Sequence, residues 1–99
     1  MHKTQMRYQV AEGFVHRQVA GYDVLISVGA NVANFNGYIT LNPTASFLWD
    51  TLSQPRTVEE LETLLTAEFD VSAEIAHRDI VQFLEMLQRN AMVNIYDEA

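Results

Sequence analysis

Residues that could do chemistry are few in this chain and form no catalytic pattern. The three histidines, His2, His16 and His77, stand far apart and lack the spacing of metal ligands. There is no cysteine, and no G-x-S-x-G motif marks a serine nucleophile. The four glycines are scattered about eight residues apart, which is typical of turns between strands and unlike a phosphate-binding loop. We therefore expect no enzyme, no bound metal and no cofactor.

Charge and hydropathy restrict the partners that the chain can bind. Thirteen Asp and Glu residues against six Lys and Arg residues give a formal net charge of -7, which would repel a phosphate backbone. No apolar run approaches the roughly 20 residues of a membrane span, and the polar start has no signal-peptide core. The sequence predicts a cytoplasmic protein that binds neither nucleic acid nor membrane.

Alternating apolar residues predict three strands in the first half of the chain. Residues 14–20 and 22–28 both alternate with a period of two. Gly21, between them, can take a positive φ and so favours a tight hairpin turn. A third alternating run, residues 35–41, follows a segment rich in Gly and Asn. We expect a three-stranded antiparallel meander.

Three helices are predicted after the strands, because the apolar period changes from two to 3.6 at Asn42. Asn42 can cap the first helix, Thr57 the second through a capping box, and Ser72 the third. The first helix carries Trp49 on one side and Phe47 on nearly the opposite side. This pattern predicts a helix that lies between the sheet and the later helices.

The elements together predict one α+β domain, in which a three-stranded antiparallel sheet is followed and covered by three helices. This domain is expected to span residues 14–99. Residues 1–13 show no clear period, and we expect them to be a flexible or loosely docked lead-in. Residues 92–96 are a candidate for a short final strand.

The third predicted strand offers a binding surface if it lies at the edge of the sheet. Residues 34–41 contain no Pro, Lys or Arg, the residues that commonly protect an edge strand. The unpaired N–H and C=O groups of such a strand can pair with an extended peptide. An alternative stays open, in which this strand is internal or is covered by the tail, residues 93–97.

Three segments of the second half carry a resemblance to a known family: NPTASFLWDTL at 42–52, PRTVEELETLLTAEFDVS at 55–72 and RDIVQFLEMLQRNAMV at 78–93. In order and spacing they resemble the PqqD family, also called the RiPP recognition element, with coverage from about residue 14 to residue 93. The resemblance implies that residues 14–99 form a winged helix-turn-helix-like, peptide-binding domain that is not a catalyst.

The resemblance also implies a partner and a site. Family members hold the leader segment of a ribosomally made precursor peptide as a strand added to their third strand, in a groove beside the third helix. They present the precursor to a modifying enzyme, which in the quinone pathway is a radical S-adenosylmethionine protein. The peptide-binding residues that carry over are Phe35, Tyr38, Ile39 and Thr40 on the strand and Ile75, Asp79, Gln82 and Met86 on the helix.

The flank of the third helix that faces the peptide is a choice between two. We favour the Asp79 flank over that of His77, Val81 and Gln88, because it adds apolar residues outside the core stripe, including an adaptable Met86.

Other uses of the same edge strand remain as alternatives. A non-catalytic adaptor could dock a partner protein there, and self-pairing would make a homodimer in place of a monomer. A DNA-binding winged helix is disfavoured because the third helix is not basic. The charge of -7 suggests a leader with basic residues.

Overall fold

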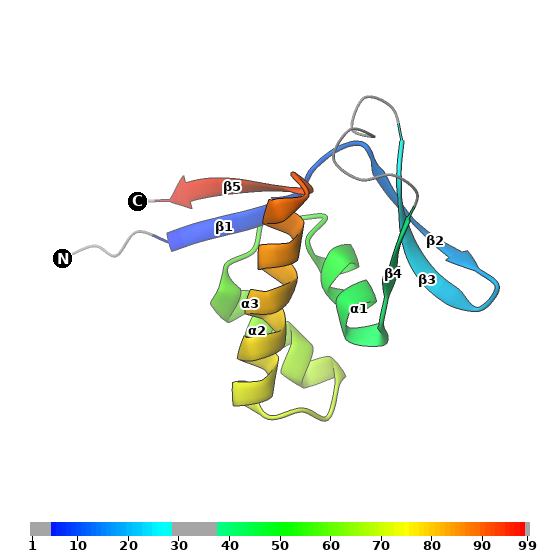
Figure 1. Cartoon of the computed structure of the whole chain (residues 1–99). Coiled ribbons are helices and arrows are strands. Elements are labelled where there is room, and N and C mark those ends of the chain that lie inside the picture. Colours follow the sequence, from blue (N-terminus) through cyan, green and yellow to red (C-terminus); the bar gives the residue numbers. More distant parts are fainter. Residues whose placement is uncertain (1–4, 29–37, 99) are drawn as a thin grey trace.

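The computed structural model describes residues 5–28 and 38–98, which form an α+β fold (Figure 1). In chain order its elements are β1 Gln5–Val10, β2 Phe14–Val19, β3 Tyr22–Ser27, β4 Tyr38–Leu41, α1 Pro43–Thr51, α2 Val58–Glu68, α3 Ala73–Arg89 and β5 Val93–Glu98. The predicted three-stranded sheet, the three helices after it and the final strand are confirmed. None of these helices is long and apolar enough to span a membrane.

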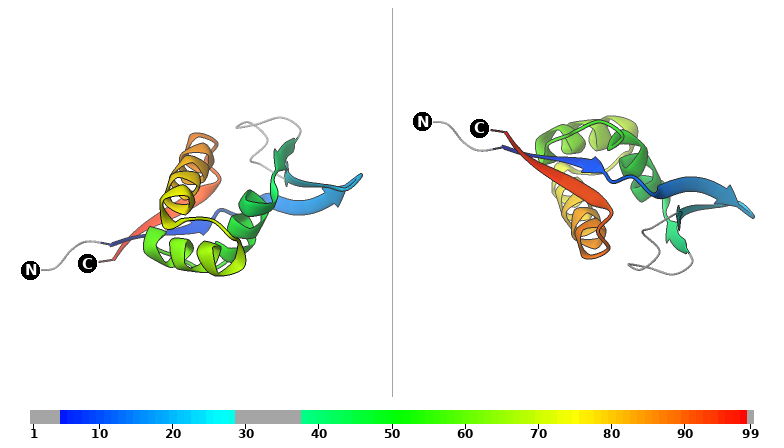
Figure 2. Two further views of the ribbon diagram at one scale, coloured as in Figure 1. Left: turned by 90° about the horizontal axis from the view of Figure 1, so that it is seen from below. Right: turned by 90° about the horizontal axis from the view of Figure 1, so that it is seen from above.

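The three-stranded sheet is antiparallel throughout and has the order β2-β3-β4. The hairpin between β2 and β3 has the predicted two-residue turn, with φ values of 53° at Ala20 and 84° at Gly21. Positive φ at both turn residues matches the twist of the flanking strands, and the β2–β3 hairpin extends away from the helices (Figure 2).

The expectation of a loosely docked lead-in is wrong for residues 5–10. These residues form β1, which pairs antiparallel with β5 in a second, two-stranded sheet, from Gln5 opposite Glu98 to Val10 opposite Val93. The segment after α1 holds the other side of β1, because Tyr8 and Arg56 exchange backbone hydrogen bonds of 2.8 and 2.9 Å. Residues 5–13 therefore belong to the folded domain.

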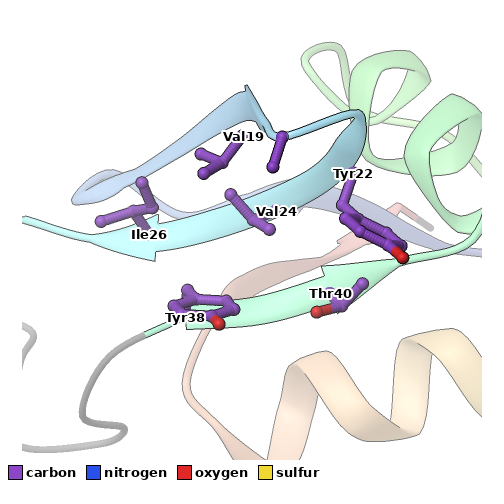
Figure 3. Close-up of a pocket in the computed structure, with 7 residues that line it drawn as sticks. Val19, Tyr22, Val24, Ile26, Tyr38 and Thr40 are labelled. Carbon is purple, nitrogen blue, oxygen red and sulfur yellow. The ribbon is translucent and has the colours of Figure 1, made fainter.

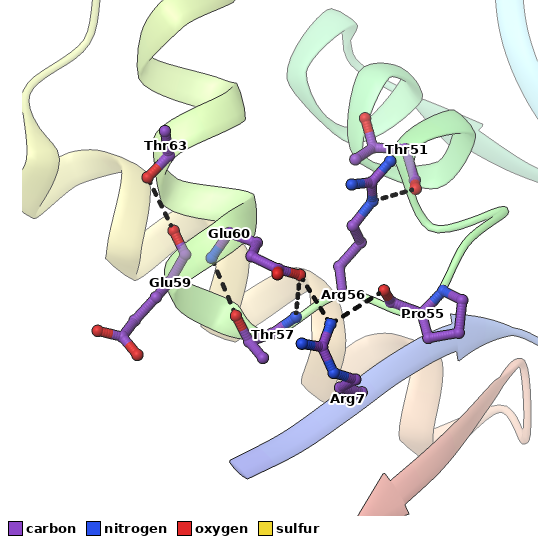
Figure 4. Close-up of polar contacts among 8 residues, drawn as sticks. All are labelled: Arg7, Thr51, Pro55, Arg56, Thr57, Glu59, Glu60 and Thr63. Carbon is purple, nitrogen blue, oxygen red and sulfur yellow. Dashed lines mark hydrogen bonds and ion pairs between the residues drawn. The ribbon is translucent and has the colours of Figure 1, made fainter. Parts of the chain in front are cut away.

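Side chains also tie β1 to the start of α2 (Figure 4). The Nη1 group of Arg7 donates to Oε1 of Glu60 at 3.0 Å. The same carboxylate oxygen accepts the backbone N–H of Thr57 at 3.1 Å, and the Thr57 hydroxyl accepts the N–H of Glu60, which completes the predicted capping box. The backbone of Thr57, and secondly Arg7, lower the pKa of Glu60 against the opposing effect of its burial.

The predicted caps are found at all three helices. The side chain of Asn42 accepts the N–H of Ala45, and that of Ser72 accepts the N–H of Ile75. At the other end of α3, Asn90 is the last cap and Ala91 takes a positive φ of 54°. These local signals fix where the helices start and stop.

One hydrophobic core joins the three-stranded sheet to the helices. The largest fully buried side chains are those of Leu25, Leu48, Leu52, Leu61, Leu65, Ile80, Leu87 and Met92. Helix α1 occupies the predicted middle position: the ring of Trp49 meets Phe14 of β2 edge-on, and Phe47 meets Phe69 after α2 in the same way. The two-sided helix therefore connects the sheet to the helical layer.

Candidate functional site

Strand β4 lies at the edge of its sheet. It pairs with β3 on one side, and no strand in the described part of the chain pairs with its other side. The C-terminal residues could have covered this edge, but they pair with β1 at a separate place, so the alternative of a covering tail is wrong. The edge was predicted from residues 34–41, of which the structure describes Tyr38–Leu41.

The hairpin geometry determines which backbone groups of β3 face β4. In a two-residue hairpin, the residues that flank the turn, here Val19 and Tyr22, exchange hydrogen bonds, and such pairs alternate along the ladder. The N–H of Val28 donates to the carbonyl of Gly13 at 2.7 Å, as this alternation requires. Leu25, an odd number of residues from Tyr22, therefore directs its N–H and C=O groups toward β4.

The same alternation identifies the open backbone groups of β4. Ile39 lies opposite Leu25, so its N–H and C=O groups point back at β3. The backbone groups of Tyr38 and Thr40 consequently point away from the sheet, to the open edge. These are the positions at which an added strand would form its hydrogen bonds.

A cleft of about 190 Å³ lies where β4 runs into α1 and faces α3. Its lining residues are Asn42, Thr44, Ala45, Leu48, Asp79, Gln82 and Phe83. The structure thus brings two of the predicted helix residues, Asp79 and Gln82, next to the end of the edge strand. Ile75 and Met86 lie on the same helix outside this lining, and Met86 packs against the core.

The two flanks of α3 face different neighbours. On the disfavoured flank, His77 Nδ1 contacts Oε2 of Glu62, so this flank faces α2. The Asp79 flank faces the cleft beside β4. Phe35, the remaining predicted strand residue, lies outside the described residues.

Comparison with known proteins assigns the family. Residues 23–93 match the sequence model of the family described as Coenzyme PQQ synthesis protein D (PqqD). The chain belongs to the PqqD family. The matched residues run from β3 to the start of β5 and so include the edge strand, the cleft and all three helices.

A solved structure shares the fold of this PqqD-family chain. It is described as TbiB1 in Complex with the TbiA(beta) Leader Peptide, and it superposes with a TM-score of 0.67 at 21% sequence identity. The similarity covers 87% of this chain and 94% of the other. At this identity the match shows the fold alone. No curated protein sequence matches the chain.

The outer face of the three-stranded sheet carries a second, more apolar concavity, which the sequence reasoning did not identify as a site (Figure 3). It measures about 430 Å³ and is lined by Val19, Ala20, Tyr22, Val24, Ile26, Tyr38 and Thr40. Tyr22 and Tyr38 are about two-thirds exposed, at 65% and 66%. The sequence signal for this concavity was the alternation of residues along β3. Tyr22, Val24 and Ile26 line the concavity, whereas Leu25 faces the core on the other side of the sheet.

His16 joins three elements of this PqqD-family fold. From β2, its Nδ1 lies 2.9 Å from Oδ1 of Asp50 in α1, and its Nε2 lies 2.9 Å from Oδ1 of Asp23 in β3. The hydroxyl of Ser46 lies 3.0 Å from the same Nε2. Both ring nitrogens can donate only when the imidazole is protonated. The hydrogen bond to Asp50 raises the pKa of His16, burial opposes it, and Asp23 adds to the increase.

This arrangement predicts that stability falls with increasing pH. Because the pKa of His16 is higher in the folded state, its stabilisation is fully present below the ordinary value of 6.5 and is lost as the pH rises through the folded-state pKa. Urea unfolding of the wild type and of His16→Gln across this range measures the effect. We expect the difference in unfolding free energy between them to shrink at high pH. Two parallel pH profiles would contradict the prediction.

Proposed function

We propose that this chain binds the leader segment of a ribosomally synthesised precursor peptide by strand addition to β4, and presents the peptide to a modifying enzyme. The observation that carries the proposal is the open edge of β4, with the backbone groups of Tyr38 and Thr40 directed outward beside a cleft on α3. Membership of the PqqD family and the fold shared with a protein solved in complex with a leader peptide support it.

Strand addition would distribute the peptide's side chains over two surfaces, because successive residues of a strand point to opposite faces. One row would continue the face of Ile39 toward α3, where Asp79 and Gln82 line the cleft and Ile75 and Met86 extend the same flank. The other row would continue the face of Tyr38 and Thr40, at the rim of the apolar concavity.

The proposed role is non-catalytic: the chain holds and orients the peptide, and a second protein does the chemistry. The modifying enzyme is, in the quinone branch of the family, a radical S-adenosylmethionine protein. We also propose that the three helices and the β2–β3 hairpin together form a winged helix-turn-helix.

Binding to DNA is not the use we propose for such a winged arrangement. Helix α3 carries Arg78 and Arg89 against Glu74, Asp79 and Glu85, whereas a helix that reads DNA is expected to be basic. The formal net charge of -7 also disfavours DNA binding, because it repels the phosphate backbone.

The direct experiment is a titration of the purified protein with a fluorescently labelled precursor peptide encoded beside its gene. We expect saturable binding that an unlabelled leader segment displaces and an unlabelled core segment does not. Light scattering in the same buffer distinguishes a monomer from a homodimer that pairs along β4. Failure to saturate at high micromolar concentrations would count against the proposal, as would competition by the core segment alone.

A further inference from the structure

The cleft between the start of α1 and α3 bears on which peptides the proposed site would select. We propose that it is a specificity pocket for one basic side chain, Lys or Arg, of the bound peptide, with the carboxylate of Asp79 as the recognising group. This inference rests on the proposed strand addition and specifies which peptides the site selects.

The lining of the cleft has two chemically different parts. Ala45, Leu48 and Phe83 supply apolar surface, and Asn42, Thr44, Asp79 and Gln82 supply polar groups. Lys and Arg side chains have the same two parts, since a methylene stem covers apolar surface and the charged end seeks polar partners. A volume of about 190 Å³ suits one side chain and is too small for a longer segment.

Asp79 has hydrogen-bonding capacity to offer a cation. Its side chain is about one-third exposed, at 34%, and its ion pair within the described residues is with Arg78, the preceding residue. The N–O distance of that pair is 3.8 Å. Strong charge-assisted hydrogen bonds are much shorter, at about 2.7 to 2.9 Å. A carboxylate has two oxygens that can accept, so a peptide cation can bind here without displacing a strong internal partner.

The chemistry of the cleft disfavours an anion. A helix start can bind anions through free N–H groups, but α1 begins with Pro43, which has none. Two of the following N–H groups are already used: that of Ala45 donates to Oδ1 of Asn42 at 2.8 Å, and that of Ser46 donates to the Asn42 carbonyl at 2.9 Å. With Asp79 in the lining of the cleft, a peptide carboxylate would meet a like charge.

The position of the cleft connects it to the open edge. Asn42 follows directly after Leu41, the last residue of β4, and Thr40 with its outward N–H is two residues before the cleft. A strand paired there directs alternate side chains toward α3. The basic residue therefore comes from the row that continues the face of Ile39, and its neighbours in the peptide lie on the outer face.

Selection from a displayed library of random peptides tests the pocket without knowledge of the natural precursor. The library is selected in parallel on the wild type, on Asp79→Asn and on Asp79→Lys. Glu85→Gln serves as a matched control, because it removes one carboxylate from an exposed position on the same helix outside the cleft. Circular dichroism confirms that each variant is folded, and Thr40→Pro identifies the peptides that depend on the β4 edge.

For the wild type and Glu85→Gln, we expect the edge-dependent peptides to share Lys or Arg at one position. Asp79→Asn is expected to lose this preference, and Asp79→Lys to select Asp or Glu at the same position. Replacing the basic residue of a selected peptide by norleucine should lower its affinity for the wild type about tenfold, and should change its affinity for Asp79→Asn little.

The outcomes separate this inference from the proposed function. Edge-dependent peptides without a basic position, or with one that Asp79→Asn leaves unchanged, would overturn the pocket and leave strand addition standing. If no selected peptide depends on the β4 edge, strand addition itself fails and the pocket fails with it.

Discussion

Replacing Trp49 by alanine is expected to lower the free energy of unfolding by about 3 to 5 kcal/mol. Trp49 is 5% exposed, and its ring meets Phe14 edge-on at a centroid distance of 6.3 Å. Its removal would leave a cavity at the place where α1 holds the three-stranded sheet. A loss of this size is a large part of the roughly 5 to 15 kcal/mol that stabilises most small domains.

Urea unfolding followed by far-ultraviolet circular dichroism measures this loss, since the substitution removes the chain's one tryptophan and with it the fluorescence signal. Trp49→Phe is the matched control, because it keeps an aromatic ring against Phe14. We expect it to lose about half as much stability or less. A loss below about 1 kcal/mol for Trp49→Ala would show that α1 does not depend on this side chain to hold the sheet.

Thr40→Pro is expected to weaken binding of the precursor peptide about tenfold or more while the fold stays intact. Proline removes the outward N–H of Thr40, and its ring stands in the path of an added strand. Edge strands tolerate proline where the lost N–H faces solvent, and the residue before a proline favours the extended conformation that Ile39 already has.

Thr40→Val is the control for this position. It keeps the backbone N–H and a β-branched side chain of similar size, so we expect near-normal affinity. Ile39→Pro is a less specific test, because the N–H of Ile39 points at β3 and its loss would break the sheet. Equal affinity of Thr40→Pro and wild type for the precursor would place the binding site away from this edge.

Local signals made much of the fold predictable. Asn42, Thr57 and Ser72 are caps that depend on a few neighbouring residues, and each begins a helix as expected. Gly21 likewise predicted the tight turn of the β2–β3 hairpin, where it takes a positive φ. The two-sided apolar pattern of α1 also predicted its place between layers, because a helix with two apolar sides needs two partners.

Pairing between distant segments was not predictable from such signals. Strand β1 has no clear alternation, and its partner β5 lies at the opposite end of the chain, where Gln5 meets Glu98. A strand of this kind is defined by its tertiary partners, including the bridge between Tyr8 and Arg56, and not by its own residue pattern.

The candidate site was predictable in outline and not in detail. The open edge followed from the absence of Pro, Lys and Arg near Ile39, and the Asp79 flank from the apolar residues beside it. The cleft depends on how α1 and α3 are placed in the fold, which brings Asp79 and Gln82 to the same cleft as Asn42 while Met86 packs on the core. Such details depend on how the helices pack, and this packing cannot be read from a single sequence.

Amide hydrogen exchange at single-residue resolution, with and without the precursor peptide, tests the central claim most directly. Strand addition predicts that the N–H groups of Tyr38 and Thr40 exchange rapidly in the free protein and slowly in the complex. The N–H groups of Ile39 and Leu41, which already bond to β3, should change much less. Saturable binding that leaves the exchange of Tyr38 and Thr40 unchanged would contradict strand addition at β4.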